Sequence, residues 1–218
     1  RAARVGRIIT LSQLGASPSS AYMLHRYKGQ VEELVRSSGL AYTILRSGLV
    51  FGEEDHFINY IALMLRSNPI FYLMPGHGEV VLHPLYVQDL VTCIERSLEL
   101  VSVVDQTLEV GGPEYTTLHD MLLTIMRVTR MRRLLISAPP YALRWMTQLV
   151  GLVLPRSLMT PQWLDVLATN RTTHLGNVYN YFHFQPRRFE DTLLTYLPKQ
   201  RHSLKLLRET FRRRPRSI

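Results

Sequence analysis

The sequence predicts an α/β protein in which a mainly parallel β-sheet carries helices, followed by a smaller and mostly helical C-terminal part. Strand-like and helix-like patterns alternate along the chain as far as Ser137, which is typical of a parallel sheet with crossover helices. Short continuous apolar runs such as Ile8–Leu11 are typical of parallel strands buried on both faces. With 218 residues, 46% of them hydrophobic and 20% charged, the chain is long enough to bury one good core.

The first half of the chain predicts two strands and two helices. Arg7–Ser12 contains a β-branched run and predicts a strand, and Ser20–Ser38 follows with the 3.6-residue apolar period of a helix. The next strand is expected over Ala41–Arg46. Phe57–Leu65 is apolar almost all round, which predicts a well-buried helix. In the first helix, one apolar stripe is expected to face the core: Met23, Tyr27, Val31, Leu34 and Val35.

The second half continues the alternation. Extended segments are expected, in order, at Val80–Leu82, Leu85–Val87, Gln106–Val110 and Arg133–Ser137. A clean helical stripe predicts a helix over Val87–Leu98. Another helix is expected after Thr117, because Asp120 stands three residues later, which is the spacing of a capping box. Beyond Ser137 the pattern is irregular and helical, and no further strand is predicted.

These patterns divide the chain into residues 1–137, a mostly helical C-terminal subdomain at 138–198, and a basic tail at 199–218. The tail contains eight Lys and Arg residues and a single Glu, so it carries +7 of the formal net charge of +9. An anionic membrane surface, an acidic partner or, last in rank, nucleic acid would attract this tail, and a solvated terminus without a partner is the alternative. Phe211 is its only aromatic residue, which argues against a nucleic-acid site.

The composition excludes several other classes of protein. Cys93 is the only cysteine, so an internal disulfide and a cysteine-based zinc site are excluded, and its apolar helical setting predicts burial. The eight histidines lack metal-ligand spacing, so no metal site is expected. Tyr141–Leu154 is apolar but interrupted by Arg144 and Gln148, so core packing, an interfacial helix or partner docking is expected there rather than a membrane span. We expect a cytoplasmic protein, or one peripheral to the inner face of a membrane.

Several motifs occur in the order in which one known superfamily has them. They are Gly39-Leu40-Ala41-Tyr42-Thr43-Ile44-Leu45-Arg46, Val50-Phe51-Gly52, Asp55-His56-Phe57, Pro75-Gly76-His77-Gly78, His83-Pro84-Leu85-Tyr86-Val87-Gln88-Asp89-Leu90 and Glu109-Val110-Gly111-Gly112-Pro113-Glu114. With Lys28 and Glu32-Glu33 upstream, the chain resembles the atypical short-chain dehydrogenase/reductase superfamily, in particular its NmrA-like branch, which includes the nucleotide-binding accessory subunit of respiratory complex I. The resemblance covers residues 1–198 and implies the second half of a Rossmann-like parallel sheet.

The Gly-rich phosphate loop of this superfamily is nowhere in the chain. That loop follows the first strand of the family and holds the pyrophosphate of a dinucleotide at a helix N-terminus. We therefore expect this chain to be the C-terminal portion of a longer protein, entering just before the fifth family strand. The resemblance implies NADP or NAD as the cofactor, and we expect binding to need the missing N-terminal part.

The resemblance also implies a set of site residues. Lys28 would contact the nicotinamide ribose, and Ser12, at the end of a strand, would be a second catalytic and cofactor contact. The backbone of Ser47, Gly48, Leu49 and Val50 would pass along the nicotinamide, and Phe51, Phe57 and His83 would line the substrate pocket. Structural roles alone would also explain these residues. Lys28 could be a solvated lysine, Ser12 a capping serine and Gly48 a turn glycine. His83 could shape the entry to a strand.

The position four residues before Lys28 decides the expected chemistry. The superfamily has a proton-donating Tyr there, and this chain has Leu24. Helical geometry points Tyr22 and Tyr27 elsewhere. Two functions therefore stay open. One is an NAD(P)(H)-dependent oxidoreductase acting on a small-molecule substrate. The other is a non-catalytic, nucleotide-binding accessory subunit or assembly factor, whose partners are the subunits of a membrane-bound electron-transfer complex.

Overall fold

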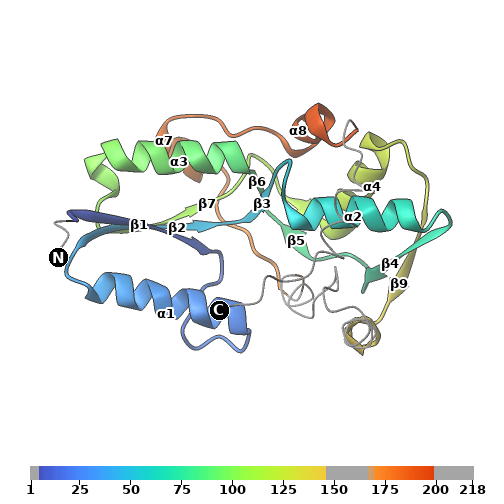
Figure 1. The fold of residues 1–218 in the computed structure, drawn as a ribbon, viewed down its shortest axis with the longest axis horizontal. Coiled ribbons are helices and arrows are strands. Elements are labelled where there is room, and N and C mark those ends of the chain that lie inside the picture. The colour runs from blue at the N-terminus through green and yellow to red at the C-terminus, as the bar shows by residue number, and fades with distance from the viewer. Residues whose placement is uncertain (1–4, 146–166, 168, 199–218) are drawn as a thin grey trace, which may run out of the picture. The chain divides into compact units, whose positions relative to one another are not determined.

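The computed structural model describes residues 5–145, 167 and 169–198, and it separates into two compact units (Figure 1). The first unit contains the described parts of Arg1–Gly52, Val81–Thr116 and Asn170–Thr192. The second contains the described parts of Glu53–Val80, Thr117–Thr169 and Leu193–Ile218. The units interleave along the sequence, and each is described separately.

The first unit is built on a three-stranded parallel sheet. Its strands are β1 (Arg7–Gln13), β2 (Ala41–Ser47) and β7 (Gln106–Val110), in the order β1-β2-β7. Arg7 pairs with Ala41 at one end of the β1–β2 ladder, and Gln13 pairs with Ser47 at the other. The structure thus confirms the predicted α/β class and the three predicted strands, which lie side by side although β7 is far from β2 in the sequence.

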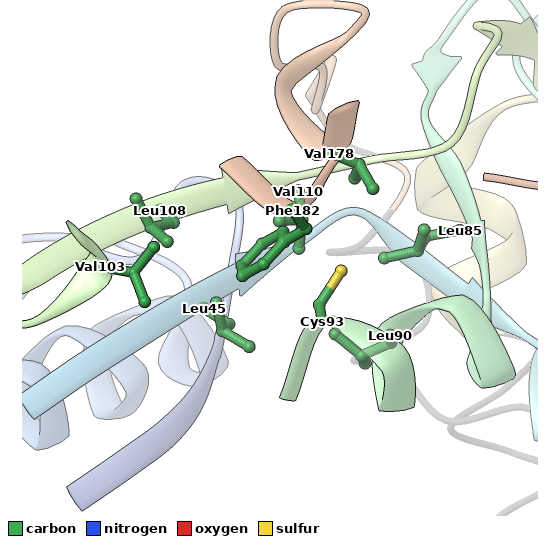
Figure 2. Packing of buried hydrophobic residues seen from close by; sticks show 9 residues of the cluster. All are labelled: Leu45, Leu85, Leu90, Cys93, Val103, Leu108, Val110, Val178 and Phe182. Atoms are coloured by element: carbon green, nitrogen blue, oxygen red, sulfur yellow. The ribbon is translucent and has the colours of Figure 1, made fainter. Parts of the chain in front are cut away.

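Helices cover both faces of this sheet (Figure 1). One face carries α1 (Met23–Ser37), and the other carries α3 (Val87–Glu99) together with α7 (Asn177–Phe182). The α3 face holds a dry core, shown in Figure 2, in which Cys93 is completely buried as predicted. The side chains of this core are Leu45, Leu85, Leu90, Cys93, Val103, Leu108, Val110, Val178 and Phe182. They come from the sheet, from α3 and α7, and from the segments beside them, so their burial closes this face of the sheet.

The α1 face is built differently, and here the predicted core stripe is wrong. Four of the five predicted core positions are exposed: Met23, Tyr27, Val31 and Leu34. The residues that α1 buries are His25, Gly29 and Glu32. Two interactions turn the helix this way. The backbone of Ser17 and Pro18 passes so close to Gly29 that a Cβ there would lie 2.3 Å from a backbone carbon. Glu32, one turn later, is buried beneath the helix, where Arg46 of β2 and Arg36 of α1 pair with its carboxylate.

Short elements complete the first unit. β3 (Leu49–Phe51) pairs in parallel with β6 (Pro84–Tyr86). The unit also contains β5 (Val81–Leu82) and a 3-10 turn, η1 (Val101–Val103). The two extended segments around His83 were predicted, whereas β3 was expected only as a turn. Only Gly48 separates the end of β2 at Ser47 from the start of β3 at Leu49. β2 pairs with β1 and β7, whereas β3 pairs with β6.

Two carboxylates hold the segment that leads into α8 (Phe189–Tyr196). Asp89 accepts a hydrogen bond from the backbone N–H of Arg187 at 2.7 Å. Glu114 accepts one from the backbone N–H of Phe189 at 3.0 Å and also binds the guanidinium of Arg188. These bonds satisfy backbone groups that would otherwise lack partners, so this irregular segment is held in one conformation.

The second unit pairs two helices with two strands. Its elements are α2 (His56–Ser67), β4 (Phe71–Pro75), α4 (Leu118–Val128, preceded by β8 at Thr116–Thr117) and β9 (Leu134–Ala138). α2 packs against α4, and β4 pairs in parallel with β9. Thr117 Oγ1 accepts from the backbone N–H of Asp120 at 3.0 Å, so the predicted cap is confirmed. The strand β4 was not predicted.

Some predictions concern residues outside the described part of the chain. The basic tail at 199–218 lies there, as does the part of Tyr141–Leu154 beyond Trp145. The three-part division of the chain therefore stays a prediction. Within the described residues, no helix combines the length and the apolar character needed to cross a bilayer.

The contact at Gly29 makes a prediction about stability. Gly29→Ala should lower the free energy of unfolding by about 1–3 kcal/mol, because the new methyl group overlaps the backbone of residues 17–18 and the loop must shift. Chemical denaturation measures this change. Gly6→Ala is the matched control, because its added Cβ meets nothing within 4 Å. Equal stability of both variants would contradict the tight packing of α1.

Candidate functional site

The carboxyl ends of the three parallel strands meet at one edge of the sheet. The strand register sets Ser12, Arg46 and Glu109 side by side. One residue further on, Gln13, Ser47 and Val110 form the next row. In open parallel sheets this edge is where ligands bind, because the loops that follow the strands open a crevice there. The two rows therefore define the candidate site.

The centre of the site is a buried carboxylate on α1. Glu32 accepts a hydrogen bond from Ser12 Oγ at 2.6 Å and two from Arg46, from Nε at 2.9 Å and from Nη2 at 2.7 Å. Arg36, one helical turn later, donates a further bond at 2.9 Å. The Glu32 side chain is only 1% exposed. A buried charge of this kind requires such partners, because an unpaired carboxylate would lose its hydration without compensation.

Electrostatics keep this cluster ionised. Burial alone would raise the pKa of Glu32, but the hydrogen bonds from Arg46, Ser12 and Arg36 together hold the pKa of the carboxyl below its usual value. The hydrogen bond to Glu32 in turn raises the pKa of Arg46. The lowered pKa favours the anionic form of Glu32, whose oxygens already accept four hydrogen bonds, so it stabilises the strand ends and is a poor general base.

Lys28 lies next to the strand ends, as its predicted role requires. Its ammonium group donates to the backbone carbonyl of Leu11 at 2.9 Å, one residue before Ser12. Leu24 lies one turn earlier on α1 and remains 40% exposed. Tyr27 is exposed, and the ring of Tyr22 contacts His25 with centroids 6.1 Å apart. The structure therefore brings Lys28 and Ser12 together, with an aliphatic side chain at the position of the family Tyr.

The predicted cofactor-lining turn contacts the protein itself. Ser47 is buried, and its hydroxyl donates to the backbone carbonyl of Ser12 at 3.3 Å. Gly48 donates its backbone N–H to Val110 O at 2.9 Å. A Cβ on Gly48 would lie 2.1 Å from the carbonyl oxygen of His83. Glycine is therefore required at position 48 because another part of the backbone approaches it, whatever ligand binds nearby.

The aromatic residues predicted to line the pocket, Phe51 and Phe57, are buried among other side chains. Leu49, Val50 and Phe51 form β3, and the completely buried ring of Phe51 contacts those of Tyr86 and Phe189 at centroid distances of 5.7 and 4.9 Å. Phe57 is buried in α2 of the second unit.

His83 is buried completely and has partners on both ring nitrogens. Nδ1 accepts from the backbone N–H of Thr173 at 3.3 Å, so Nε2 carries the proton and donates to Gly112 O at 2.7 Å. Its ring also meets that of Tyr115, with centroids 4.7 Å apart. Burial lowers the pKa of His83, and the bond to Gly112 offsets only part of this effect. His83 is therefore a neutral residue that joins three segments of the chain.

Several polar residues of the site were not predicted from the sequence. Thr173 donates its hydroxyl to Glu109 Oε2 at 2.9 Å and accepts from Asn177 Nδ2 at 2.9 Å. Arg46 Nη1 lies 3.8 Å from Glu109 Oε1, so one guanidinium links the carboxylates of Glu32 and Glu109. The signal for Glu32 was present, because Arg36 follows it at i+4 on a helix beside a strand that ends in Arg46. The contacts of Thr173 and Asn177 with Glu109 join segments that are far apart in the sequence, so no local sequence pattern predicts them.

The comparisons with known proteins connect this chain to one respiratory subunit. It is 33% identical over 116 residues to the NADH dehydrogenase (ubiquinone) 1 alpha subcomplex subunit 9, mitochondrial, of Arabidopsis thaliana, covering 53% of this chain and 29% of that protein. It is 29% identical over 150 residues to the mouse protein of the same name, covering 69% of this chain and 40% of that protein. The chain thus spans less than half the length of these curated relatives. No family model matches it.

Solved structures share the fold at lower sequence identity. The NADPH-dependent quinone oxidoreductase QOR2 of Escherichia coli, solved with NADPH, superposes with a TM-score of 0.69 at 16% identity, over 90% of this chain and 67% of that chain. The fold is therefore a Rossmann-like α/β fold, as predicted. The curated relatives named above are mitochondrial NADH dehydrogenase subunits, and the shared fold agrees with the resemblance that the sequence motifs predicted.

The Glu32 cluster makes a prediction about stability. Glu32→Gln should lower the free energy of unfolding by about 3 kcal/mol, because a neutral amide replaces the buried carboxylate with which Arg46 and Arg36 pair. Glu33→Gln, at the exposed neighbouring position, should change it by less than about 0.5 kcal/mol. Urea titrations of the two variants measure the difference, and similar values for both would show that the cluster does not hold α1 to the sheet.

His83 makes a prediction about pH. Its pKa is lower in the folded protein than in the unfolded chain, so its contribution to stability is fully present above the unfolded pKa and is lost as pH falls through the folded pKa. Unfolding free energy should therefore decline below about pH 6.5 in the wild-type protein, and this decline should be shallower in His83→Gln. His174→Gln, at an exposed position, should keep the wild-type slope. Parallel slopes for all three proteins would contradict a buried neutral His83.

Proposed function

We propose that this chain is the C-terminal part of a nucleotide-binding accessory subunit of a membrane-bound respiratory electron-transfer complex, and that it holds a nucleotide without oxidising or reducing it. One observation carries the second half of this proposal. The hydroxyl of Ser12 is bonded to the buried carboxylate of Glu32, and the position one turn before Lys28 is the aliphatic Leu24. Reductase chemistry of the family type needs a positioned proton donor, and neither position supplies one.

The subunit assignment rests on the relatives. Both curated relatives carry the name of a mitochondrial NADH dehydrogenase subunit, and their similarity to this chain extends over half of it or more. We propose that the partners of this chain are other subunits of such a complex, and that its location is mitochondrial and peripheral to the inner membrane. The basic tail would then strengthen contact with anionic lipid or with acidic subunits.

The proposed nucleotide is NAD or NADP, held at the carboxyl ends of β1 and β2. Lys28 and Ser12 would face the nicotinamide ribose, and the backbone of Ser47–Val50 would pass along the ring. The E. coli neighbour of the same fold was solved with NADPH, which supports a nucleotide as the ligand, and the general preference of parallel sheets for ligands at the carboxyl ends of their strands supports this edge. Because the chain spans 29–40% of its relatives, the pyrophosphate-binding loop would have to come from the remainder of a longer protein.

The roles proposed for the pocket residues follow from their burial. Phe51 and His83 have no exposed surface, so we propose that they stabilise the packing around the strand ends and do not touch a substrate.

A second candidate function is an oxidoreductase acting on a small molecule. Lys28 favours it, because its ammonium lies beside Ser12 at the strand ends, where a nicotinamide ribose would be bound. The proton would then have to come from water or from the substrate itself.

Activity and assembly together test the leading proposal. The longer protein that supplies the pyrophosphate-binding loop should transfer no hydride from NADH or NADPH to a panel of quinones and carbonyl compounds. Leu24→Tyr should not restore turnover, because Ser12 stays bonded to Glu32. An epitope-tagged chain produced in its own cells should migrate with the NADH dehydrogenase complex in native gels. Turnover by the unmodified chain would support the oxidoreductase, and migration away from the complex would remove the subunit assignment.

A further inference from the structure

The small sheet of the second unit has an apolar outer face. β4 and β9 pair in parallel (Figure 1), and successive side chains of each strand point to opposite faces of the sheet. Tyr72 and Met74 of β4 are only 7% and 4% exposed, so their face is the inner one. The outer face consists of three cross-strand pairs, Phe71 with Leu134, Leu73 with Ile136, and Pro75 with Ala138.

This outer face is exposed in a way that is unusual for parallel strands. Leu134 keeps 65% of its surface exposed, and Ile136 keeps 39%. Parallel sheets normally have both faces covered, and a sheet face that meets water normally carries polar side chains. None of the six outer residues of β4 and β9 is polar. A contiguous apolar surface of this kind marks a contact with a partner protein or with a membrane.

Two exposed aromatic side chains follow β9. Residues 140–145 are helical, and Tyr141 and Trp145 are about one helical turn apart, so both lie on the same side of this segment. They keep 71% and 67% of their surface exposed, whereas Leu143 between them is buried. Tyr and Trp are enriched where proteins meet the boundary between lipid and water, because each ring combines an apolar body with a polar tip.

The charges around β9 favour an anionic membrane as the partner. Residues 121–164 contain six arginines and no acidic residue. Two of these arginines, Arg130 and Arg132, are exposed in the turn between α4 and β9, directly before Leu134. Arginines beside aliphatic and aromatic side chains suit an anionic bilayer, where the guanidinium groups meet lipid phosphates and the apolar side chains enter the acyl boundary.

We propose that the second unit binds anionic lipid through the outer face of β4 and β9, with Tyr141 and Trp145 at the boundary between lipid and water. This proposal rests on the proposed membrane-peripheral location and deepens it by naming the surface that meets the membrane. It differs from the role proposed for the basic tail, because the contact is apolar as well as electrostatic.

Tryptophan fluorescence tests the contact directly. Trp163→Phe leaves Trp145 as the only tryptophan of the chain, and the basic tail contains none. Vesicles of phosphatidylcholine and phosphatidylglycerol with brominated acyl chains should quench Trp145, because bromine quenches tryptophan only at short range. Attachment through the tail alone would leave Trp145 unquenched. A chain that does not bind these vesicles, or that binds them with Trp145 unquenched, would overturn the proposal.

Matched substitutions test the sheet face. Leu134→Asp should weaken vesicle binding about tenfold, because it places a carboxylate in the apolar contact and beside anionic phosphates. Leu98→Asp is the control, because Leu98 is 67% exposed on α3 of the first unit, and it should leave binding unchanged. Both variants should keep the wild-type melting temperature, since both side chains are already exposed. Equal binding by the two variants would show that the face does not contact lipid.

Neutral vesicles test the arginines. Arg130→Gln and Arg132→Gln should each weaken binding to vesicles that contain phosphatidylglycerol by about fivefold. The same variants should bind vesicles of phosphatidylcholine alone nearly as the wild-type chain does, because those vesicles carry no net charge. Equal losses on both kinds of vesicle would contradict the preference for anionic lipid.

Assembly separates this proposal from the proposed function. A chain whose Trp145 is quenched by vesicles but which migrates away from the NADH dehydrogenase complex would remove the subunit assignment alone. A Leu134→Asp chain that binds vesicles normally but no longer migrates with the complex would identify the sheet face as a contact with another subunit. That result would overturn its assignment to lipid.

Discussion

The buried carboxylate of Glu32 organises the first unit of this protein. Three hydrogen bonds, one from Ser12 and two from Arg46, tie it to the ends of β1 and β2, and Arg36 of the same helix donates a fourth. Because an unpaired buried charge is so costly, rotation of the helix would require the bonds from Ser12 and Arg46 to break. The orientation of α1, the exposure of its apolar stripe and the position of Lys28 all follow from this one constraint.

The two faces of the sheet use different physics. On the α3 face, Leu45, Leu108 and Val110 pack against α3 and α7 in a dry core. On the α1 face, contact depends on close backbone approach at Gly29 and on the Glu32 ion cluster. The polar interactions on the α1 face hold the strand ends in place. They also occupy the hydroxyl of Ser12, which donates its hydrogen bond to Glu32. A site of this kind suits the holding of a ligand better than the transfer of a proton.

Residue patterns predicted much of the fold because strands and amphipathic helices follow local periodicity. β7 was predicted at its observed bounds, and α3 to within one residue. β3 and β4 were missed, because short strands depend on a partner that lies elsewhere in the sequence. In the site, the roles of Ser12 and Lys28 stay predictions, and their bonds to Glu32 and Leu11 were not foreseen. The long-range contacts of His83 with Thr173 and Gly112 were equally invisible, since they join segments brought together only by folding.

The sequence by itself determined the α/β class, the order of most elements, the burial of Cys93 and the resemblance to one superfamily. It also showed that Leu24 stands where a Tyr would be expected. Only the tertiary structure decided which face of α1 is buried. Periodicity records where apolar residues lie on a helix, but it does not record a buried ion cluster that outweighs them. For α1 the charge on Glu32 decided the orientation, and the apolar stripe was left exposed.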